Sequence, residues 1–113
     1  MARDDYHVIV YQILSYLYVK LKEGENPDPN LLKADSNYLN INEQYWTSIM
    51  VMIFEEGYIK GIQITKPWGN QIIINNLDKC EITAKGIEYL CDNSFLNKVK
   101  QFLKDTKAIV PFI

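Results

Sequence analysis

The longest apolar stretch of the chain, residues 6–19, has no polar face when it is placed on a helix. Asp4 and Asp5 precede this stretch and can cap a helix, and Gly24 follows it and can end one. A helix that is apolar all round lies at the centre of a core or is shared with a partner. Because a chain of 113 residues is small for covering such a helix completely, we expect a subunit interface along it and a homodimer.

The composition predicts a folded protein that does not enter a membrane. Hydrophobic residues make up 48% of the chain and charged residues 23%, which excludes intrinsic disorder. Gln12 and Ser15 interrupt the first apolar stretch, which is shorter than the roughly 20 residues that a membrane span needs. Two cysteines, Cys80 and Cys91, are too few for a disulfide framework. We expect both to be buried free thiols in a cytoplasmic protein.

Capping residues predict two more helices in the first half of the chain. Asp28 followed by Pro29 combines a capping side chain with a proline at the first helical position, which predicts a short helix that reaches about Asp35. Asn42 can cap a longer helix that Gly57 ends. The solvent face of this third helix is predicted to carry Gln44, Thr47, Ser48, Val51 and Glu55.

Alternating residues after Gly57 predict a β-hairpin. Residues 58–65 form the first strand of this prediction, residues 71–74 the return strand, and Pro67–Asn70 the turn. Trp68 lies at the tip, where two interpretations stay open. An exposed tryptophan there can enter a groove, stack on a base or anchor a partner, whereas a buried one folds back over the apolar face of the hairpin.

Two amphipathic helices are predicted after the hairpin. The first starts at Thr83 and ends near Asp92, and Ser94 is predicted to cap the second. The apolar stripe of the last helix consists of Phe95, Leu96, Val99, Phe102 and Leu103. Its opposite side carries a basic strip formed by Lys100, Lys104 and Lys107.

Three helices followed by a hairpin is the element order of a winged helix-turn-helix. We therefore expect a mainly α protein of the α+β class, with a β-hairpin wing and two additional C-terminal helices. Residues 1–113 are predicted to form a single domain, in which residues 1–82 are the helix-turn-helix core and wing and residues 83–113 the C-terminal extension. The third helix takes the position of the recognition helix.

Several short segments in a fixed order resemble one family. They are Glu56-Gly57-Tyr58-Ile59, the segment 82–90 (ITAKGIEYL), Asn93-Ser94, Lys98, Leu103-Lys104 and Val110-Pro111. In this order they resemble the YjcQ-like family of small winged-helix proteins from Gram-positive bacteria and their phages. The resemblance spans most of the chain. It implies a winged-helix fold and a phage or prophage context, without an established biochemical activity.

Charge is divided unevenly between the two halves of the chain. Residues 1–57 carry four basic residues against nine acids, a net charge of -5, and residues 58–113 carry eight against five, a net charge of +3. The third helix has three acids and no Lys or Arg, so it would approach phosphates against repulsion. Nucleic acid would therefore be held mainly by the wing and the last helix. The candidate contacts are Gln44, Thr47, Ser48, Lys60, Lys66, Trp68, Lys98, Lys100, Lys104 and Lys107.

Two functional hypotheses follow from this pattern. The first is a DNA-associated, regulator-like protein of phage or prophage type that binds double-stranded DNA through its wing and C-terminal lysines. The alternative is a protein-interaction module that keeps the winged-helix scaffold without binding DNA, with Trp68 or the third helix contacting the partner. We expect no enzymatic activity, metal or cofactor, because His7 is the single histidine and neither a nucleophile–base pattern nor a phosphate-binding loop is present.

Overall fold

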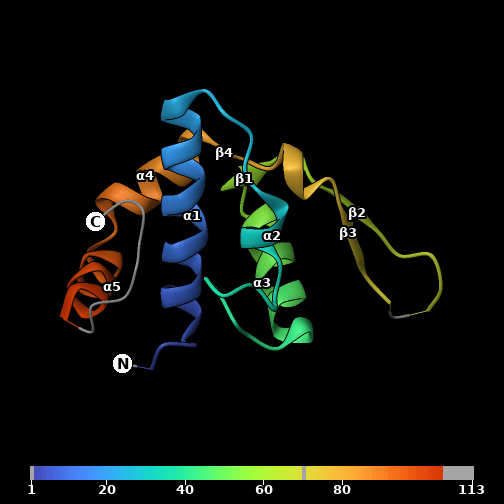
Figure 1. Ribbon diagram of the computed structural model, residues 1–113, viewed down its shortest axis with the longest axis horizontal. Helices are drawn as coiled ribbons and strands as arrows, with labels where there is room; N and C mark the ends of the chain where they lie inside the picture. Colours follow the sequence, from blue (N-terminus) through green and yellow to red (C-terminus); the bar gives the residue numbers. More distant parts are fainter. Residues whose placement is uncertain (1, 70, 106–113) are drawn as a thin grey trace.

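The computed structural model describes residues 2–69 and 71–105 as a mainly helical α+β protein. The helices and strands follow one another along the chain as drawn in Figure 1. They are α1 (Tyr6–Glu23), α2 (Pro29–Leu32), α3 (Glu43–Glu55), β1 (Ile59–Lys60), β2 (Gln63–Thr65), β3 (Ile73–Asn75), a 3-10 turn (Leu77–Lys79), β4 (Glu81–Ile82), α4 (Ala84–Asp92) and α5 (Ser94–Asp105).

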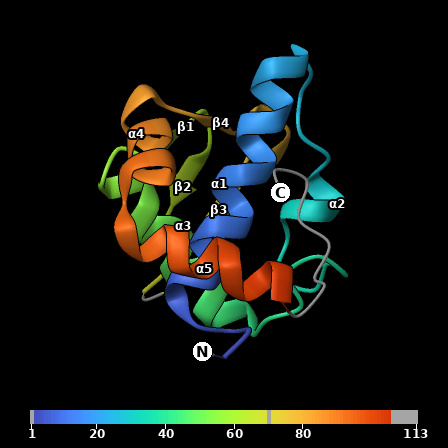
Figure 2. The same ribbon diagram turned by 90° about the vertical axis from the view of Figure 1, so that its left-hand side faces the viewer.

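Helix α1 is the centre of the molecule. Every residue from Val8 to Leu17 is buried, and α3, α4, α5 and β4 all contact this helix (Figures 1 and 2). Its two buried polar residues are hydrogen-bonded, since Gln12 Nε2 donates to the Tyr38 carbonyl at 3.2 Å and Ser15 Oγ to the Gln12 carbonyl at 3.2 Å. One chain therefore covers residues 8–17, contrary to expectation, whereas Leu21 near the end of α1 is 45% exposed. The apolar face that suggested a subunit interface is the core of a single chain.

The ends of the first three helices are those that the sequence predicts, with two exceptions. Gly24 ends α1 in the left-handed conformation with φ 70°, and the Asp28 side chain accepts a hydrogen bond from the Asn30 N–H at 2.9 Å. Asn42 accepts hydrogen bonds from two N–H groups of the first turn of α3. The Asp5 side chain does not cap α1, because it accepts from the Ala2 N–H instead. Helix α2 ends at Leu32 rather than near Asp35, because Lys33 is already extended.

The strands form two short antiparallel pairs rather than one hairpin with long arms. Strand β1 pairs with β4, and β2 pairs with β3. The predicted first strand, residues 58–65, is broken at Gly61, where φ is +92°. A Cβ at this position would lie 2.9 Å from the Lys79 carbonyl carbon, so only glycine allows the two chain segments to approach this closely. As a result, the hairpin of β2 and β3 projects from the body of the molecule (Figure 1).

The two C-terminal helices lie where the sequence predicts them, with a different cap on the second. Thr83 Oγ1 accepts a hydrogen bond from the Gly86 N–H at 3.0 Å, which caps α4 as expected. Helix α5 is capped by Asn93 rather than by Ser94, because Asn93 Oδ1 accepts from the Leu96 N–H at 3.1 Å. Helix α5 contacts α1, as its position in Figure 2 indicates. It buries Leu96, Val99 and Leu103 in the core.

The two cysteines differ in their surroundings. Cys80 is buried between the 3-10 turn and β4, and burial raises the pKa of its thiol from 9.0 to about 12, with a smaller contribution from Glu81. Cys91 is exposed on α4, which corrects the expectation that both thiols are buried. Each thiol is free.

Candidate functional site

The exposed side of α3 offers few hydrogen-bond donors. Gln44 and Ser48 are exposed and Thr47 is half-buried, as the helical pattern predicts. However, Thr47 Oγ1 donates to the Glu43 carbonyl at 2.9 Å and Ser48 Oγ donates to the Gln44 carbonyl at 3.1 Å. Both hydroxyl protons are therefore used within the helix, and their oxygens can act toward a partner only as acceptors. The Gln44 amide is the remaining uncharged donor of the three predicted contacts.

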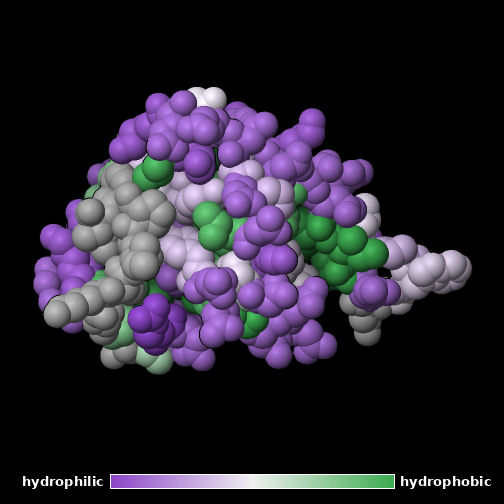
Figure 3. All heavy atoms as spheres, in the orientation of Figure 1, coloured by the Kyte–Doolittle hydropathy of each residue, from purple (hydrophilic) through white to green (hydrophobic). Residues whose placement is uncertain are grey.

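The hairpin tip presents a large aromatic side chain to solvent. Trp68 is 82% exposed, which decides between the two interpretations that the sequence left open. Lys66, two residues before it, is also exposed. Nearer the body, Ile73 is 36% exposed and Ile64, Ile72 and Ile74 are half-buried. Figure 3 shows a hydrophobic patch where the hairpin leaves the body.

A groove separates α3 from the β3 arm of the hairpin. It consists of two adjoining hollows of about 520 and 420 Å³, which share Glu43, Thr47, Gln71 and Ile72 in their walls. Gln71 and the isoleucines 72–74 were not among the predicted site residues. The run Ile72-Ile73-Ile74 could have indicated them, because three consecutive apolar residues in a two-stranded hairpin leave both of its faces apolar.

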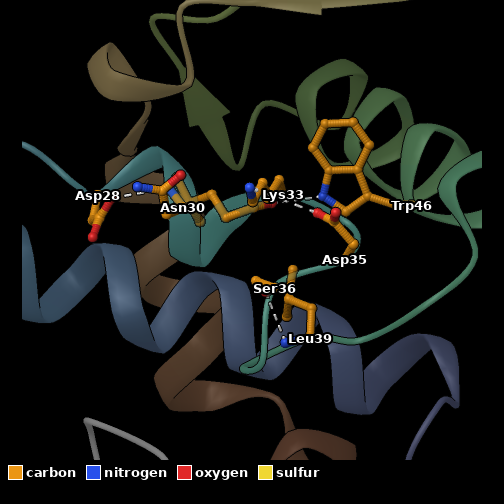
Figure 4. Close-up of polar contacts among 8 residues, drawn as sticks. Asp28, Asn30, Lys33, Asp35, Ser36, Leu39 and Trp46 are labelled. Atoms are coloured by element: carbon orange, nitrogen blue, oxygen red, sulfur yellow. Dashed lines mark hydrogen bonds and ion pairs between the residues drawn. The ribbon is translucent and has the colours of Figure 1, made fainter.

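One end of this groove is built by the connector between α2 and α3. The indole N–H of Trp46 reaches from α3 to the Leu32 carbonyl at 2.7 Å, which holds the connector against the helix (Figure 4). Lys33 and Asp35 on the same wall lie 4.0 Å apart as an exposed ion pair. With Glu43 included, two carboxylates and one ammonium group line the groove, so its charge is not positive.

The predicted lysines do not form one surface in the described part of the chain. Lys66 is on the hairpin, and Lys60 lies 4.0 Å from Glu81 across the β1–β4 pair. Lys98 and Lys104 are exposed on α5, which lies at the opposite end of the 42 Å long axis from the hairpin (Figure 1). Lys100 is half-buried on the same helix. Lys107 lies outside the described residues.

The family model described as YjcQ protein matches residues 11–109. This match covers most of α1, the whole hairpin and all of α4 and α5. The chain belongs to the YjcQ family. The match confirms the resemblance to this family and includes the segments from Glu56 to Lys104, whereas Val110-Pro111 lies beyond the matched residues. No curated protein and no solved structure matches this YjcQ-family chain.

The described helices and acidic side chains of this YjcQ-family chain bear on membrane and metal binding. Among residues 2–69 and 71–105, no helix has the length and hydropathy to cross a membrane. Within the same described ranges, no group of three or more His, Cys, Asp or Glu side chains is arranged to hold a metal ion. The α3–hairpin region, with its exposed Trp68 and the groove beside it, is the candidate site.

Proposed function

We propose that this YjcQ-family protein is a protein-interaction module on a winged-helix scaffold, and that the β2–β3 hairpin is its binding element. The exposure of Trp68 carries the proposal, because a tryptophan that is 82% exposed leaves a large apolar surface in water. Tryptophan is among the residues that contribute most to binding energy in protein interfaces. The half-buried isoleucines below the tip extend this apolar surface toward α3.

The order of the elements supports the winged-helix part of the proposal. Helices α1, α2 and α3 precede the hairpin, and α3 borders the groove beside it. In this arrangement α3 takes the place of a recognition helix and the hairpin that of a wing. The scaffold thus offers a helix and a projecting ribbon on either side of one groove.

The charges favour a protein partner over a nucleic acid. Nucleic-acid affinity depends on several cationic side chains that contact phosphates together. Glu43 and Asp35 line the groove, and Lys66 is the charged residue of the hairpin arms. The exposed lysines of α5 are at the far end of the molecule. An apolar hairpin beside a weakly acidic groove suits an apolar segment of another protein.

The test is affinity capture from a lysate of the encoding organism with wild-type protein, Trp68→Ala and Phe95→Ala. Phe95 is the matched control, because it is an aromatic residue that is 43% exposed on α5, away from the hairpin. We expect a partner protein to bind the wild type and Phe95→Ala and to be lost with Trp68→Ala. Equal recovery of that partner with Trp68→Ala would contradict the proposal.

DNA association is the second candidate, and the placement of Gln44 favours it. Gln44 lines the groove together with Gln71 of the hairpin, and glutamine can read base edges in a major groove. We would measure fluorescence anisotropy of labelled duplex DNA over a range of salt concentrations. DNA association requires affinity that falls steeply with salt and drops with Lys66→Glu more than with the control Lys98→Glu. Absence of binding even at low salt would remove this candidate.

A further inference from the structure

A cluster of tyrosines lies on a part of the molecule that the proposed function does not use. Tyr6 begins α1, Tyr58 lies between α3 and β1, and Tyr89 lies on α4. The Tyr58 and Tyr89 rings are stacked, with centroids 4.4 Å apart and an angle of 17° between their planes. The Glu56 carboxylate is close enough to all three hydroxyls to act on them electrostatically. We call these four residues the tyrosine cluster.

The backbone holds the tyrosine cluster in place. The Tyr58 carbonyl accepts a hydrogen bond from the Thr83 N–H at 3.0 Å, which fixes the start of α4 against the turn after α3. Gly86 allows this approach, because a Cβ there would collide with the Tyr58 carbonyl oxygen and lie 2.8 Å from Ile82 Cγ1. Figure 2 shows α4 beside β1 in this region. The stacked rings are therefore carried by two segments locked to one another, which reduces the entropy that a ligand must remove.

The hydroxyls of the tyrosine cluster retain their hydrogen-bonding capacity. Tyr6, Tyr58 and Tyr89 are each half-buried, and none of their hydroxyls is hydrogen-bonded to another residue of the described ranges. Burial raises the pKa of all three, and the nearby Glu56 carboxylate raises them further. The three phenols are therefore neutral at physiological pH and offer both donors and aromatic rings.

The electrostatics of the tyrosine cluster favour a cation. The chain itself places one there, since Lys85 Nζ lies 5.7 Å from the centroid of the Tyr58 ring. Glu56 is exposed and forms no ion pair with another described residue. Asp4 and Asp5 add negative charge beside Tyr45, whose hydroxyl donates to the Asp4 carbonyl at 2.7 Å. A ring face and an unpaired carboxylate together match the chemistry of a guanidinium group.

We propose that the tyrosine cluster is a second binding surface, which takes an arginine side chain from an exposed segment of a partner protein. The guanidinium plane takes the place of the exposed Lys85 ammonium group over the Tyr58 ring of the stacked pair and donates hydrogen bonds to the Glu56 carboxylate. Arginine fits better than lysine, because its planar group can stack on a ring and pair with a carboxylate at once. None of the four cluster residues belongs to the hairpin or lines the groove beside α3, so this proposal does not depend on the proposed function.

The test is an NMR titration of the uniformly ¹⁵N-labelled chain with a short acetylated and amidated peptide that alternates glycine and arginine. The comparison peptide replaces each arginine with citrulline, which keeps the shape and removes the charge. We expect saturable shifts of the Tyr58 and Tyr89 amide signals with the arginine peptide and an affinity lower by at least about fivefold with citrulline. Equal affinity for the two peptides would overturn the proposal.

Two single-residue variants test whether the peptide binds at Glu56. Glu56→Gln should weaken binding of the arginine peptide about threefold, because an exposed ion pair is lost while the fold keeps its core. Glu88→Gln is the matched control, since Glu88 is an exposed carboxylate on α4 next to Tyr89. If both variants weaken binding equally, the effect is bulk charge and the proposal fails. Shifts of the same amides on concentrating the chain without peptide would also overturn it, by assigning the surface to a second copy.

Discussion

Tyr11 of α1 and Tyr38 of the α2–α3 connector lie near one another but differ in what their hydroxyls contact. Tyr38 Oη donates to the Gln12 carbonyl at 2.8 Å, and Gln12 Nε2 donates back to the Tyr38 carbonyl. The Tyr11 hydroxyl is buried and has no hydrogen-bond partner among the described residues. Burial raises the pKa of Tyr11 to about 12, with a smaller effect from Cys91. A buried hydroxyl without a partner loses its interaction with water and gains nothing in return.

Removing these two hydroxyls should therefore have different effects on stability. We expect Tyr38→Phe to lower the free energy of unfolding by about 1 kcal/mol, because a made hydrogen bond is lost. Tyr11→Phe should leave the free energy of unfolding unchanged or raise it by up to about 1 kcal/mol. Urea unfolding followed by circular dichroism measures both. A larger loss with Tyr11→Phe than with Tyr38→Phe would show that the Tyr11 hydroxyl is satisfied in solution.

The buried Cys80 thiol should make stability fall in alkaline solution. Its pKa rises from 9.0 to about 12 on folding, so above pH 9 the unfolded chain releases a proton that the folded chain retains. The free energy of unfolding then decreases with pH, by up to about 1.4 kcal/mol per pH unit, until the folded thiol itself ionises. Cys80→Ala should reduce this slope between about pH 9 and 10, measured by urea unfolding. Cys91→Ala, at the exposed thiol, should keep the wild-type slope.

Among the elements, α5 depends on a cap that the sequence alone assigned to the wrong residue. Asn93 supplies the acceptor for the Leu96 N–H, whereas Ser94 is already the first helical residue. We expect Asn93→Ala to lower the free energy of unfolding by about 1 kcal/mol and Ser94→Ala to change it by less than about half as much. Thermal unfolding of the two variants gives the comparison. Equal losses would mean that the serine hydroxyl shares the capping role.

The elements that the sequence predicted well are those specified by neighbouring residues. Gly24, Asn42 and Thr83 cap helices through contacts within one helical turn of their own positions. The end of α1 and the starts of α3 and α4 could therefore be predicted from neighbouring residues alone. Strand β4 could not, because its partner β1 is more than twenty residues away and each contributes two residues. The break at Gly61 has the same origin, since the Lys79 carbonyl that requires a glycine there approaches only in the folded chain.

For the candidate site, the sequence identified the tip and the exposed face of α3 but not how they combine. Turn chemistry around Trp68 placed the side chain at a tip, and helical periodicity placed Gln44 and Ser48 in solvent. The groove between them depends on how the hairpin leans against α3, which no local pattern encodes. The distance between the hairpin and the α5 lysines likewise follows from packing around α1.

At the scale of the whole molecule, one chain covers its own most apolar helix. Because residues 8–17 are buried without a second subunit, we expect the 113-residue chain to be a monomer of 13.2 kDa at tens of micromolar concentration. Light scattering coupled to size exclusion measures the mass. A mass near twice that of one chain would show that another surface associates, and repeating the measurement with Phe95→Glu would test the exposed edge of α5 as that surface.

Strands β1 and β4 pair through two residues each at the base of the projecting hairpin. The chain therefore leaves and re-enters the folded body at nearly one point. Ile62 and Cys80, next to this pair, belong to the core, whereas Lys66 and Trp68 at the tip are exposed. Substitutions at the tip should therefore cost little stability. The tip of the hairpin is therefore the part of this fold where surface chemistry can change with the least effect on folding.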